Sequence, residues 1–233
     1  MPTKPKRNYQ PEAGAIDQRD VFQTPPYAVD PLVPYLQAAG VRTVWESAAG
    51  QGYLACWLDM AGFTVIETDL DRGQDRFVTQ RDADAEVTNV PFSLKYRYTW
   101  QACQDNRPFA LLMPSDALFA GSEMWPLIDR YNLQWLLPEK RIDYKAPTAG
   151  WLKSCAQMHT CWVTRYLNLP SFVTRVKLAK PGRQALNHLA PLWDAWHADY
   201  VARRDGVAAE GPAVADRTIY APRDFFALAD LTV

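Results

Sequence analysis

The chain has 233 residues, of which 48% are hydrophobic and 22% are charged, and its formal net charge is −1. This composition is close to that of an average globular protein, and it excludes a bulk polycation that would coat nucleic acid without selectivity. The sequence shows neither an apolar run of about 18 residues, as a membrane span needs, nor the apolar block of a signal peptide near its start. We therefore expect a cytoplasmic protein with no membrane partner.

Residues 1–20 are polar and proline-containing, which predicts a flexible N-terminal arm. Asp30 and Pro31 open an apolar pattern that stops before Gly40, as in a helix capped by Asp30. A strand, a helix and a second strand are predicted next, at 41–45, 53–61 and 63–68.

Residues 71–85 are rich in Asp, Arg and Gln, which predicts a surface loop. The elements predicted after it are a helix at 93–104 and strands at 109–113, 133–137 and 158–167, with 171–178 extending or pairing with the last strand. An amphipathic helix is expected at 184–202, with its tryptophans at the spacing of a packing face. We thus expect an arm at 1–20, one domain at 21–179, and a helical extension and tail at 180–233.

Three features follow successive predicted strands. A glycine turn runs from Glu46 to Gly52, an acid, Asp69, ends the second strand, and Asn89 opens the tetrapeptide Asn89-Val90-Pro91-Phe92. The intervals are 23 residues from Glu46 to Asp69 and 20 from Asp69 to Asn89, so each feature begins a new strand-loop-helix unit of a parallel sheet. All three would meet at the edge beyond the carboxyl ends of the strands, where open α/β sheets bind ligands.

These motifs resemble those of the class I S-adenosylmethionine (SAM) dependent methyltransferases, and in particular the adenine amino-methyltransferases of phages and restriction systems. The tetrapeptide is similar to the family's Asn-Pro-Pro-Phe, and the likeness covers roughly residues 20–170. The resemblance implies a Rossmann-like α/β fold with a mostly parallel seven-stranded sheet and helices on both faces. It also implies SAM as the cofactor, an enzyme that methylates the exocyclic amine of adenine, and DNA as the partner.

The cofactor's groups define what the protein must supply. Glycines in the turn let the backbone approach closely, amides at the start of the next helix can meet a carboxylate, and Asp69 can accept two ribose hydroxyls. By position, Glu46 would lie near the methionine ammonium, Thr24 near the carboxylate, and Asp75 with Phe77 around the adenine. The complete expected set is Thr24, Pro25, Glu46, Ala48, Gly50, Gly52, Asp69, Asp75 and Phe77.

The tetrapeptide has its own chemical rationale. An aromatic amine is a poor nucleophile, so the site must hold its nitrogen against the methyl group. The Asn89 side-chain oxygen and the residue 90 carbonyl can accept its two N–H groups, and Phe92 can stack on the base, a contact worth roughly 1 to 3 kcal/mol. Catalysis would rest on this alignment, since no separate general base is evident.

The chain departs from the family at Val90, where relatives have proline. Valine still offers a carbonyl but lacks proline's fixed φ. Alternatives therefore stay open: a catalytically impaired SAM-fold protein that binds nucleic acid or a protein, or a methyltransferase acting on RNA or on protein glutamine. Substrate recognition is expected from inserted loops at 95–98, 115–130 and 140–153. A basic rim is expected there, at Lys95, Arg97, Lys140, Arg141, Lys145 and Lys153.

The cysteines and histidines show no metal-binding spacing, which argues against a zinc site and against histidine-based catalysis. Cys56 and Cys103 fall in apolar helical contexts, where a buried free thiol is expected.

Overall fold

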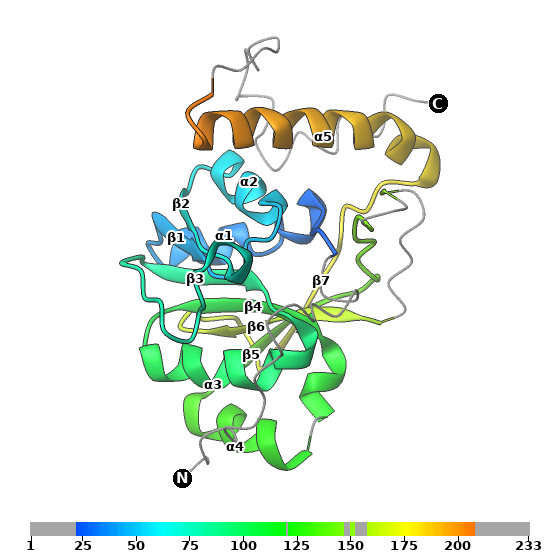
Figure 1. The fold of residues 1–233 in the computed structure, drawn as a ribbon. Helices are drawn as coiled ribbons and strands as arrows, with labels where there is room; N and C mark the ends of the chain where they lie inside the picture. Colours follow the sequence, from blue (N-terminus) through cyan, green and yellow to red (C-terminus); the bar gives the residue numbers. More distant parts are fainter. Residues whose placement is uncertain (1–21, 120, 147–149, 152–157, 208–233) are drawn as a thin grey trace.

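The structure is a computed structural model that describes residues 22–119, 121–146, 150–151 and 158–207. In this part of the chain seven strands form one sheet in the order β2-β1-β3-β4-β6-β5-β7 (Figure 1). The strands are β1 (Thr43–Glu46), β2 (Thr64–Glu67), β3 (Ala85–Asn89), β4 (Phe109–Pro114), β5 (Gln134–Pro138), β6 (Thr160–Arg165) and β7 (Val173–Val176). Only β6 runs antiparallel to its neighbours, β4 and β5. The predicted fold class, a Rossmann-like α/β fold with a mostly parallel seven-stranded sheet, is confirmed.

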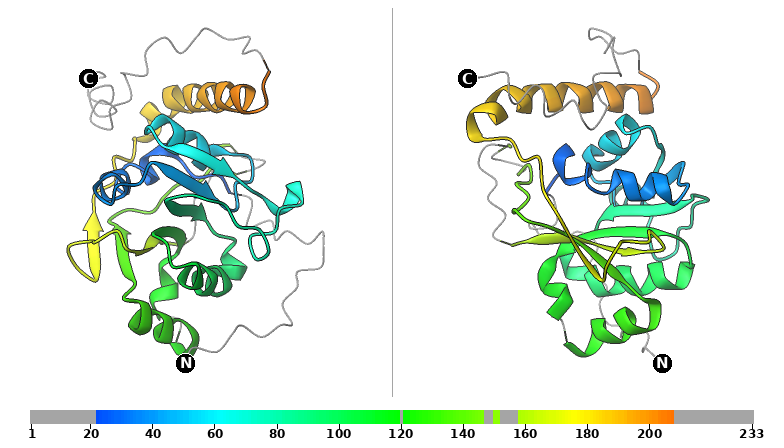
Figure 2. Two further views of the ribbon diagram at one scale, coloured as in Figure 1. Left: turned by 90° about the vertical axis from the view of Figure 1, so that its left-hand side faces the viewer. Right: turned by 180° about the vertical axis from the view of Figure 1, so that it is seen from behind.

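Helices cover both faces of the sheet, as predicted (Figures 1 and 2). Helices α1 (Val33–Ala38), α2 (Tyr53–Met60) and α5 (Arg183–Arg204) pack into one hydrophobic cluster. Helices α3 (Lys95–Asp105) and α4 (Gly121–Tyr131) pack into the other. Short 3-10 helices lie at η2 (Pro26–Ala28), η3 (Leu70–Arg72), η4 (Phe92–Leu94) and η5 (Ser115–Phe119). None of the described helices combines the length and the apolar character needed to cross a membrane.

Strand β4 shows why its sequence is continuously apolar. Ala110 and Leu112 face the cluster of α2 and α5, whereas Phe109, Leu111 and Met113 face the cluster of α3 and α4. Successive side chains of a strand point to opposite faces, so a strand covered on both sides needs apolar residues at every position.

The strand order reverses at β1. From β1 the chain crosses to β2 on one side, and then returns to β3 on the other side. The carboxyl ends of β1 and β3 therefore meet at a topological switch point, the place where open α/β sheets bind ligands. Glu46 ends β1 and Asn89 ends β3, so both residues lie at this switch point.

The prediction for residues 171–178 was wrong. These residues contain β7, which pairs in parallel with β5, with Trp135 opposite Val173, and not with the strand at 160–165. The reason is that β6 lies between β4 and β5, so both of its edges are already occupied.

Two further local predictions need correction. The first helix begins at Val33 with Leu32 at its N-cap, and Asp30 makes no capping bond; Pro34 supplies the first-turn proline instead. The inserted loops expected at 95–98 and 115–130 are helical instead: residues 95–98 begin α3, and residues 115–119 and 121–130 form η5 and most of α4. The expected arm at 1–20 lies outside the described residues, as does Cys155.

Candidate functional site

The glycine turn between β1 and α2 has the backbone that its sequence predicts. Gly50 and Gly52 have φ values of +52° and +90°, in the left-handed region that side chains disfavour. Gly52 is the N-cap of α2. A Cβ on Gly52 would lie 3.2 Å from Nη1 of Arg204, so the position is also tight. The positive φ therefore favours glycine at both positions, and a side chain at Gly52 would in addition displace the Arg204 guanidinium.

Asp69 joins the end of β2 to this turn. One of its carboxylate oxygens accepts the Gly50 N–H at 2.7 Å, and the other accepts the Asp71 N–H at 2.8 Å. The turn and the acid, predicted separately from sequence, therefore lie in contact. Each carboxylate oxygen can accept more than one bond, so acceptor capacity toward a ligand remains.

Glu46 is a buried carboxyl group, with 1% of the residue exposed. Its Oε1 accepts the Thr88 hydroxyl and the Ala48 N–H, the latter at 3.3 Å. Its Oε2 is buried and has no hydrogen-bond partner among the described residues. Burial raises the pKa of Glu46 well above its ordinary value, and no cation of the described chain is paired with it. The position therefore suits a cationic ligand, because a nearby positive charge would lower the pKa of Glu46 and favour its ionised form.

Asn89 presents a second buried oxygen at the same edge. Its Nδ2 donates to the Phe22 carbonyl at 3.4 Å, whereas its Oδ1 is buried without a hydrogen-bond partner in the described part of the chain. A buried acceptor that lacks a hydrogen bond costs about 1 to 3 kcal/mol of stability. The amide is thus oriented by its nitrogen, and its oxygen is available to a donor from a ligand.

The rest of the tetrapeptide leads from β3 into η4. Val90 is 2% exposed, packs into the cluster of α3 and α4, and donates its N–H to the Leu112 carbonyl at 3.2 Å. Pro91 is the N-cap of η4 and accepts the Leu94 N–H through its carbonyl. Phe92 is half-buried at the start of η4. Residue 90 therefore continues the strand pairing, and a proline there would lose this bond.

The segment before η2 lies between α2 and Asn89. The carbonyl of Thr24 accepts Nε1 of Trp57 in α2 at 2.7 Å, and Thr24 and Pro25 are both buried. Through Phe22 the same segment reaches the Asn89 amide. The structure thus places Thr24 at the site's border, held by its backbone carbonyl.

Asp75 and Phe77 form a compact turn. The Asp75 carboxylate accepts the Phe77 N–H at 2.9 Å. The Phe77 ring packs edge-on against Tyr98, with 5.1 Å between centroids, and the Arg97 guanidinium lies 3.6 Å above it. One face of Phe77 is therefore already covered by a cation from α3.

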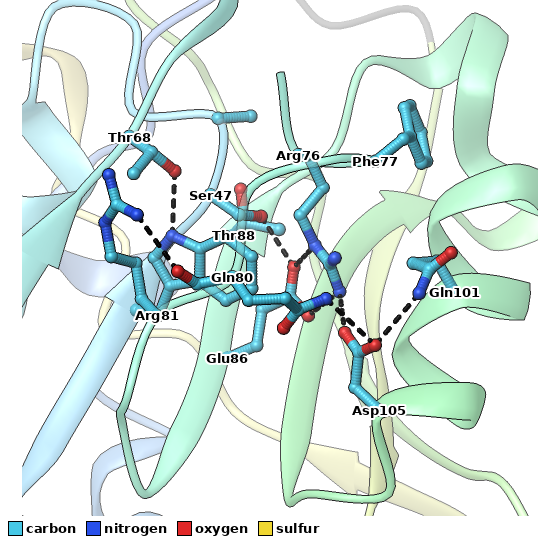
Figure 3. Close-up of polar contacts among 12 residues, drawn as sticks. Ser47, Thr68, Arg76, Phe77, Gln80, Arg81, Glu86, Thr88, Gln101 and Asp105 are labelled. Atoms are coloured by element: carbon cyan, nitrogen blue, oxygen red, sulfur yellow. Dashed lines mark hydrogen bonds and ion pairs between the residues drawn. The ribbon is translucent and has the colours of Figure 1, made fainter. Parts of the chain in front are cut away.

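Sequence reasoning missed the buried ion cluster between these two residues (Figure 3). Arg76 is 2% exposed and makes two bonds to Glu86, at 2.5 and 2.6 Å, and one to Asp105 at 2.5 Å. Its guanidinium also lies 4.4 Å from the Trp45 ring centroid, and Glu86 accepts the Ser47 hydroxyl at 2.6 Å. The cluster ties the 75–77 turn to β3, to α3 and to the glycine turn.

The expectation that residues 71–85 form only a surface loop was therefore wrong at Arg76. The available signal was Glu86, an acid flanked by Ala85 and Val87 within a buried strand. A buried carboxylate needs a partner, and Arg76 is that partner.

A separate cavity of about 520 Å³ lies at the same edge of the sheet, beyond β4, β5 and β7. Its lining residues are Ser115, Leu137, Pro138, Glu139, His159 and Arg175. Ser115 follows β4, which neighbours the Asn89 strand, so this cavity continues along the edge away from the glycine turn. Its size is in the range of small-molecule sites.

The expected basic rim is only partly formed. Lys140 and Arg141 are exposed after β5, whereas Arg97 covers Phe77 and Lys145 pairs with Asp194 at 2.8 Å. Lys153 lies outside the described residues.

Metal ligands are not gathered in the part of the chain that the structure describes, where no three His, Cys, Asp or Glu residues are placed to share an ion. Cys56 and Cys103 are buried free thiols, as predicted, and so is Cys161.

Comparison with known proteins gives few matches. No protein-family model and no curated protein matches the chain. Among solved structures, a chain of a type I R-M system, from work on its complex assembly and conformational transition, is similar with a TM-score of 0.37 and 12% identity, over 80% of this chain. This chain spans about half of that one, 52%. The 23S rRNA methyltransferase ErmE is similar with a TM-score of 0.34 and 10% identity, over 86% of this chain and 97% of ErmE. Scores this low identify neither the family nor the activity of the chain.

Proposed function

We propose that this chain is a SAM-dependent methyltransferase that transfers a methyl group to the exocyclic amine of adenine in DNA. The observation that carries the proposal is a pair of buried oxygens at the switch point, Oε2 of Glu46 and Oδ1 of Asn89, which have no hydrogen-bond partner among the described residues. They lie at the ends of the adjacent strands β1 and β3. One suits a cation and the other suits a neutral donor, which are the groups that SAM and an aromatic amine present.

The cofactor fits the residues around the glycine turn. Glu46 would hold the methionine ammonium, and Asp69 would accept the ribose hydroxyls with the capacity that its bonds to Gly50 and Asp71 leave. The turn of Asp75 and Phe77 would border the adenine, held in place by the Arg76 cluster. When bound, SAM supplies an electrophilic methyl group on a sulfonium.

Asn89 would act on the acceptor amine. Its Oδ1 accepts one N–H and the carbonyl of Val90 accepts the other, which holds the nitrogen lone pair toward the methyl group. Fixing this geometry removes much of the entropic part of the barrier. Phe92 stacks on the base, and the proton released from the methylated amine passes to water.

The cavity beyond β4 and β5 supports an extended acceptor. It continues the same edge past Asn89 and contains His159 and Arg175; the Arg175 side chain is 74% exposed and pairs with Glu139 at 3.7 Å. A DNA strand whose adenine occupies the Asn89 site would run toward these groups. Lys140 and Arg141, which follow β5, lie beside the cavity. Such a base must first leave its stack.

The decisive experiment has two steps. Calorimetry with SAM and with its demethylated product first tests the cofactor site. Transfer of labelled methyl groups to DNA, RNA and protein pools then tests the acceptor, and label in adenine of DNA is expected. Label confined to RNA or to protein glutamine would replace the acceptor, and absence of SAM binding would remove the whole proposal.

A non-catalytic SAM-fold protein is the second candidate, and the observation that favours it is the Val90 N–H bond to Leu112. This bond holds residue 90 in strand pairing instead of a proline turn. Cofactor binding without any methyl transfer would support this candidate.

A further inference from the structure

Helix α5 lies across α2 and reaches the end of β2 (Figure 1). At its C-terminal half, the His197 ring nitrogen Nε2 lies 2.7 Å from the carbonyl oxygen of Gln51, inside the glycine turn. The His197 ring also stacks on Tyr53 of α2, with 3.7 Å between centroids and 6° between planes. The turn is thus bonded to a helix that begins more than 130 residues later in the chain.

Glu67, the last residue of β2, is the second link. Its side chain is only 5% exposed and accepts bonds from Arg204 at 3.0 Å, from the Tyr200 hydroxyl, and from Arg72 at 2.8 Å. Arg72 also donates to the Gly50 carbonyl at 3.2 Å. Arg204 and Tyr200 therefore act on a carboxylate that is joined to the glycine turn through Arg72.

The surroundings of Gly52 show how close α5 lies to the glycine turn. A Cβ at this residue would lie 3.2 Å from Arg204 and 3.5 Å from Glu67. His197, Tyr200 and Arg204 are spaced at i, i+3 and i+7, so they share one face of α5. That face contacts the glycine turn at Gln51 and the end of β2 at Glu67.

The helix is firmly attached. Trp193 is fully buried in the core cluster. The Asp194 carboxylate accepts bonds from the Tyr53 hydroxyl, from Nε1 of Trp151 and from Lys145, at 2.8 to 2.9 Å. Partial burial raises the pKa of Asp194, but these hydrogen bonds and the Lys145 charge together outweigh it and hold the pKa below its ordinary value. A helix anchored in this way can hold the turn in one geometry.

We propose that α5 is a positioning element of the ligand site: His197, Tyr200 and Arg204 hold the glycine turn and the end of β2 in the binding geometry. The proposal rests on the proposed function in that it takes SAM as the ligand of this turn. None of the three residues contacts the reacting atoms. Their effect is on cofactor affinity, through the conformation of residues 50–52.

Arg203 and Arg204 offer a matched pair for the test. Both side chains are partly exposed and both attach α5 to the body of the protein. Arg203 pairs with Asp59 near the far end of α2 and with Asp199, whereas Arg204 pairs with Glu67 beside the turn and with Asp205. Arg204→Ala and Arg203→Ala each remove one such attachment, but only Arg204 bonds Glu67, the carboxylate linked to the turn. Arg203 reaches the positioning residues only through a 5.7 Å contact with the Tyr200 ring.

We expect Arg204→Ala to weaken binding of the demethylated product of SAM about tenfold, as loss of a charged hydrogen bond does. Arg203→Ala should change this Kd less than twofold. Its Tm should fall by about as much as that of Arg204→Ala. Tyr200→Phe should weaken binding in the same direction as Arg204→Ala, and Arg204→Lys should restore part of the affinity. Equal Kd values for the two alanine variants would overturn the proposal.

Amide hydrogen exchange separates this proposal from the proposed function. In the ligand-free protein, Arg204→Ala should speed exchange at residues 50–53 more than Arg203→Ala does. If the wild type binds no SAM, the proposed function fails, and this comparison still decides the role of α5. Equal exchange at the turn in both variants would show that α5 only adds stability.

Discussion

The Asp69 carboxylate accepts the Gly50 N–H at 2.7 Å, so the end of β2 and the glycine turn form one hydrogen-bonded unit. A side chain that receives backbone N–H groups on both oxygens is held in one orientation. Any ligand that reaches Asp69 therefore meets a carboxylate already positioned, and the residue has a structural role as well as a binding role.

Asp69→Ala should weaken cofactor binding at least tenfold, because the ribose would lose a charged acceptor worth roughly 1.5 to 3 kcal/mol. The variant should also lower Tm, since the N–H groups of Gly50 and Asp71 lose their acceptor. Calorimetry and thermal unfolding measure the two effects. Asp69→Asn is the control, because its amide oxygen can still accept one backbone bond. Unchanged affinity in the alanine variant would remove Asp69 from the site.

Asn89→Ala should abolish methyl transfer and leave SAM affinity within about twofold, because the Asn89 oxygen is assigned to the acceptor amine. Folding should be little affected, since the side chain makes only the 3.4 Å bond to Phe22 and leaves Oδ1 unpartnered in the described chain. The measurements are initial rates and cofactor titration on the same preparation. Turnover at the wild-type level would contradict the mechanism.

Val90→Pro tests the departure from the family motif. On sequence alone, proline is expected to maintain or raise methyl transfer by fixing the turn, a gain of about 0.4 to 1 kcal/mol. The structure reverses the expectation for stability, because proline cannot donate the bond that Val90 makes to Leu112. An unpaired carbonyl costs about 1 to 3 kcal/mol, and each kcal/mol lowers Tm by about 2 to 4 °C in a chain of this size.

Val90→Ala is the control for this variant, since it removes side-chain packing but keeps the backbone bond. Turnover and Tm are measured together. A destabilised and inactive proline variant counts against the adenine-methyltransferase assignment. A stable and more active proline variant would show that residue 90 can leave its strand pairing at little cost and adopt the turn of the family motif.

Glu46→Gln should stabilise the free protein above pH 4.5, increasingly as pH rises, and should weaken cofactor binding. Burial raises the folded-state pKa of Glu46 above its ordinary 4.5. Stability from a group shifted upward is complete below pH 4.5 and is lost as pH rises through the folded-state pKa. Glutamine keeps the acceptor for Thr88 and Ala48 and does not ionise. The Tm of the variant should therefore exceed that of the wild type by an amount that grows from pH 5 to pH 8.

Thermal unfolding at several pH values, with and without the demethylated product of SAM, measures this effect. The ligand's ammonium should stabilise ionised Glu46, so the ligand should raise Tm more in the wild type than in the variant. An equal rise in both proteins at pH 8 would place the ammonium elsewhere.

The meeting of three strand ends at one edge of the sheet could be predicted from sequence because each motif follows an apolar run at a regular interval. Asp69 and Gly50 were expected at one edge, and they are in contact. Their direct hydrogen bond could not be predicted, because spacing along the chain indicates which strand ends meet but not which atoms pair.

Contacts between distant segments account for what was missed. Arg76 looks like a surface residue in a polar stretch, and only the tertiary fold brings it to Glu86 and Asp105. In α4, Met124, Leu127 and Ile128 have helical spacing, but Pro126 lies between them and weakens the helical signal. The links from α5 to Gln51 and Glu67 cross more than 130 residues and leave no local pattern.

The antiparallel strand β6 has a consequence for the order of assembly during synthesis. It is the only link between β4 and β5 in the sheet, yet Thr160 emerges 46 residues after Pro114. Until then β4, an apolar strand, has an open edge that can pair with other chains. Ribosome-bound chains that end between β5 and β6 should therefore bind chaperones more strongly than chains that extend past Arg165. Joining the two halves of the sheet is a late, non-local and slow event.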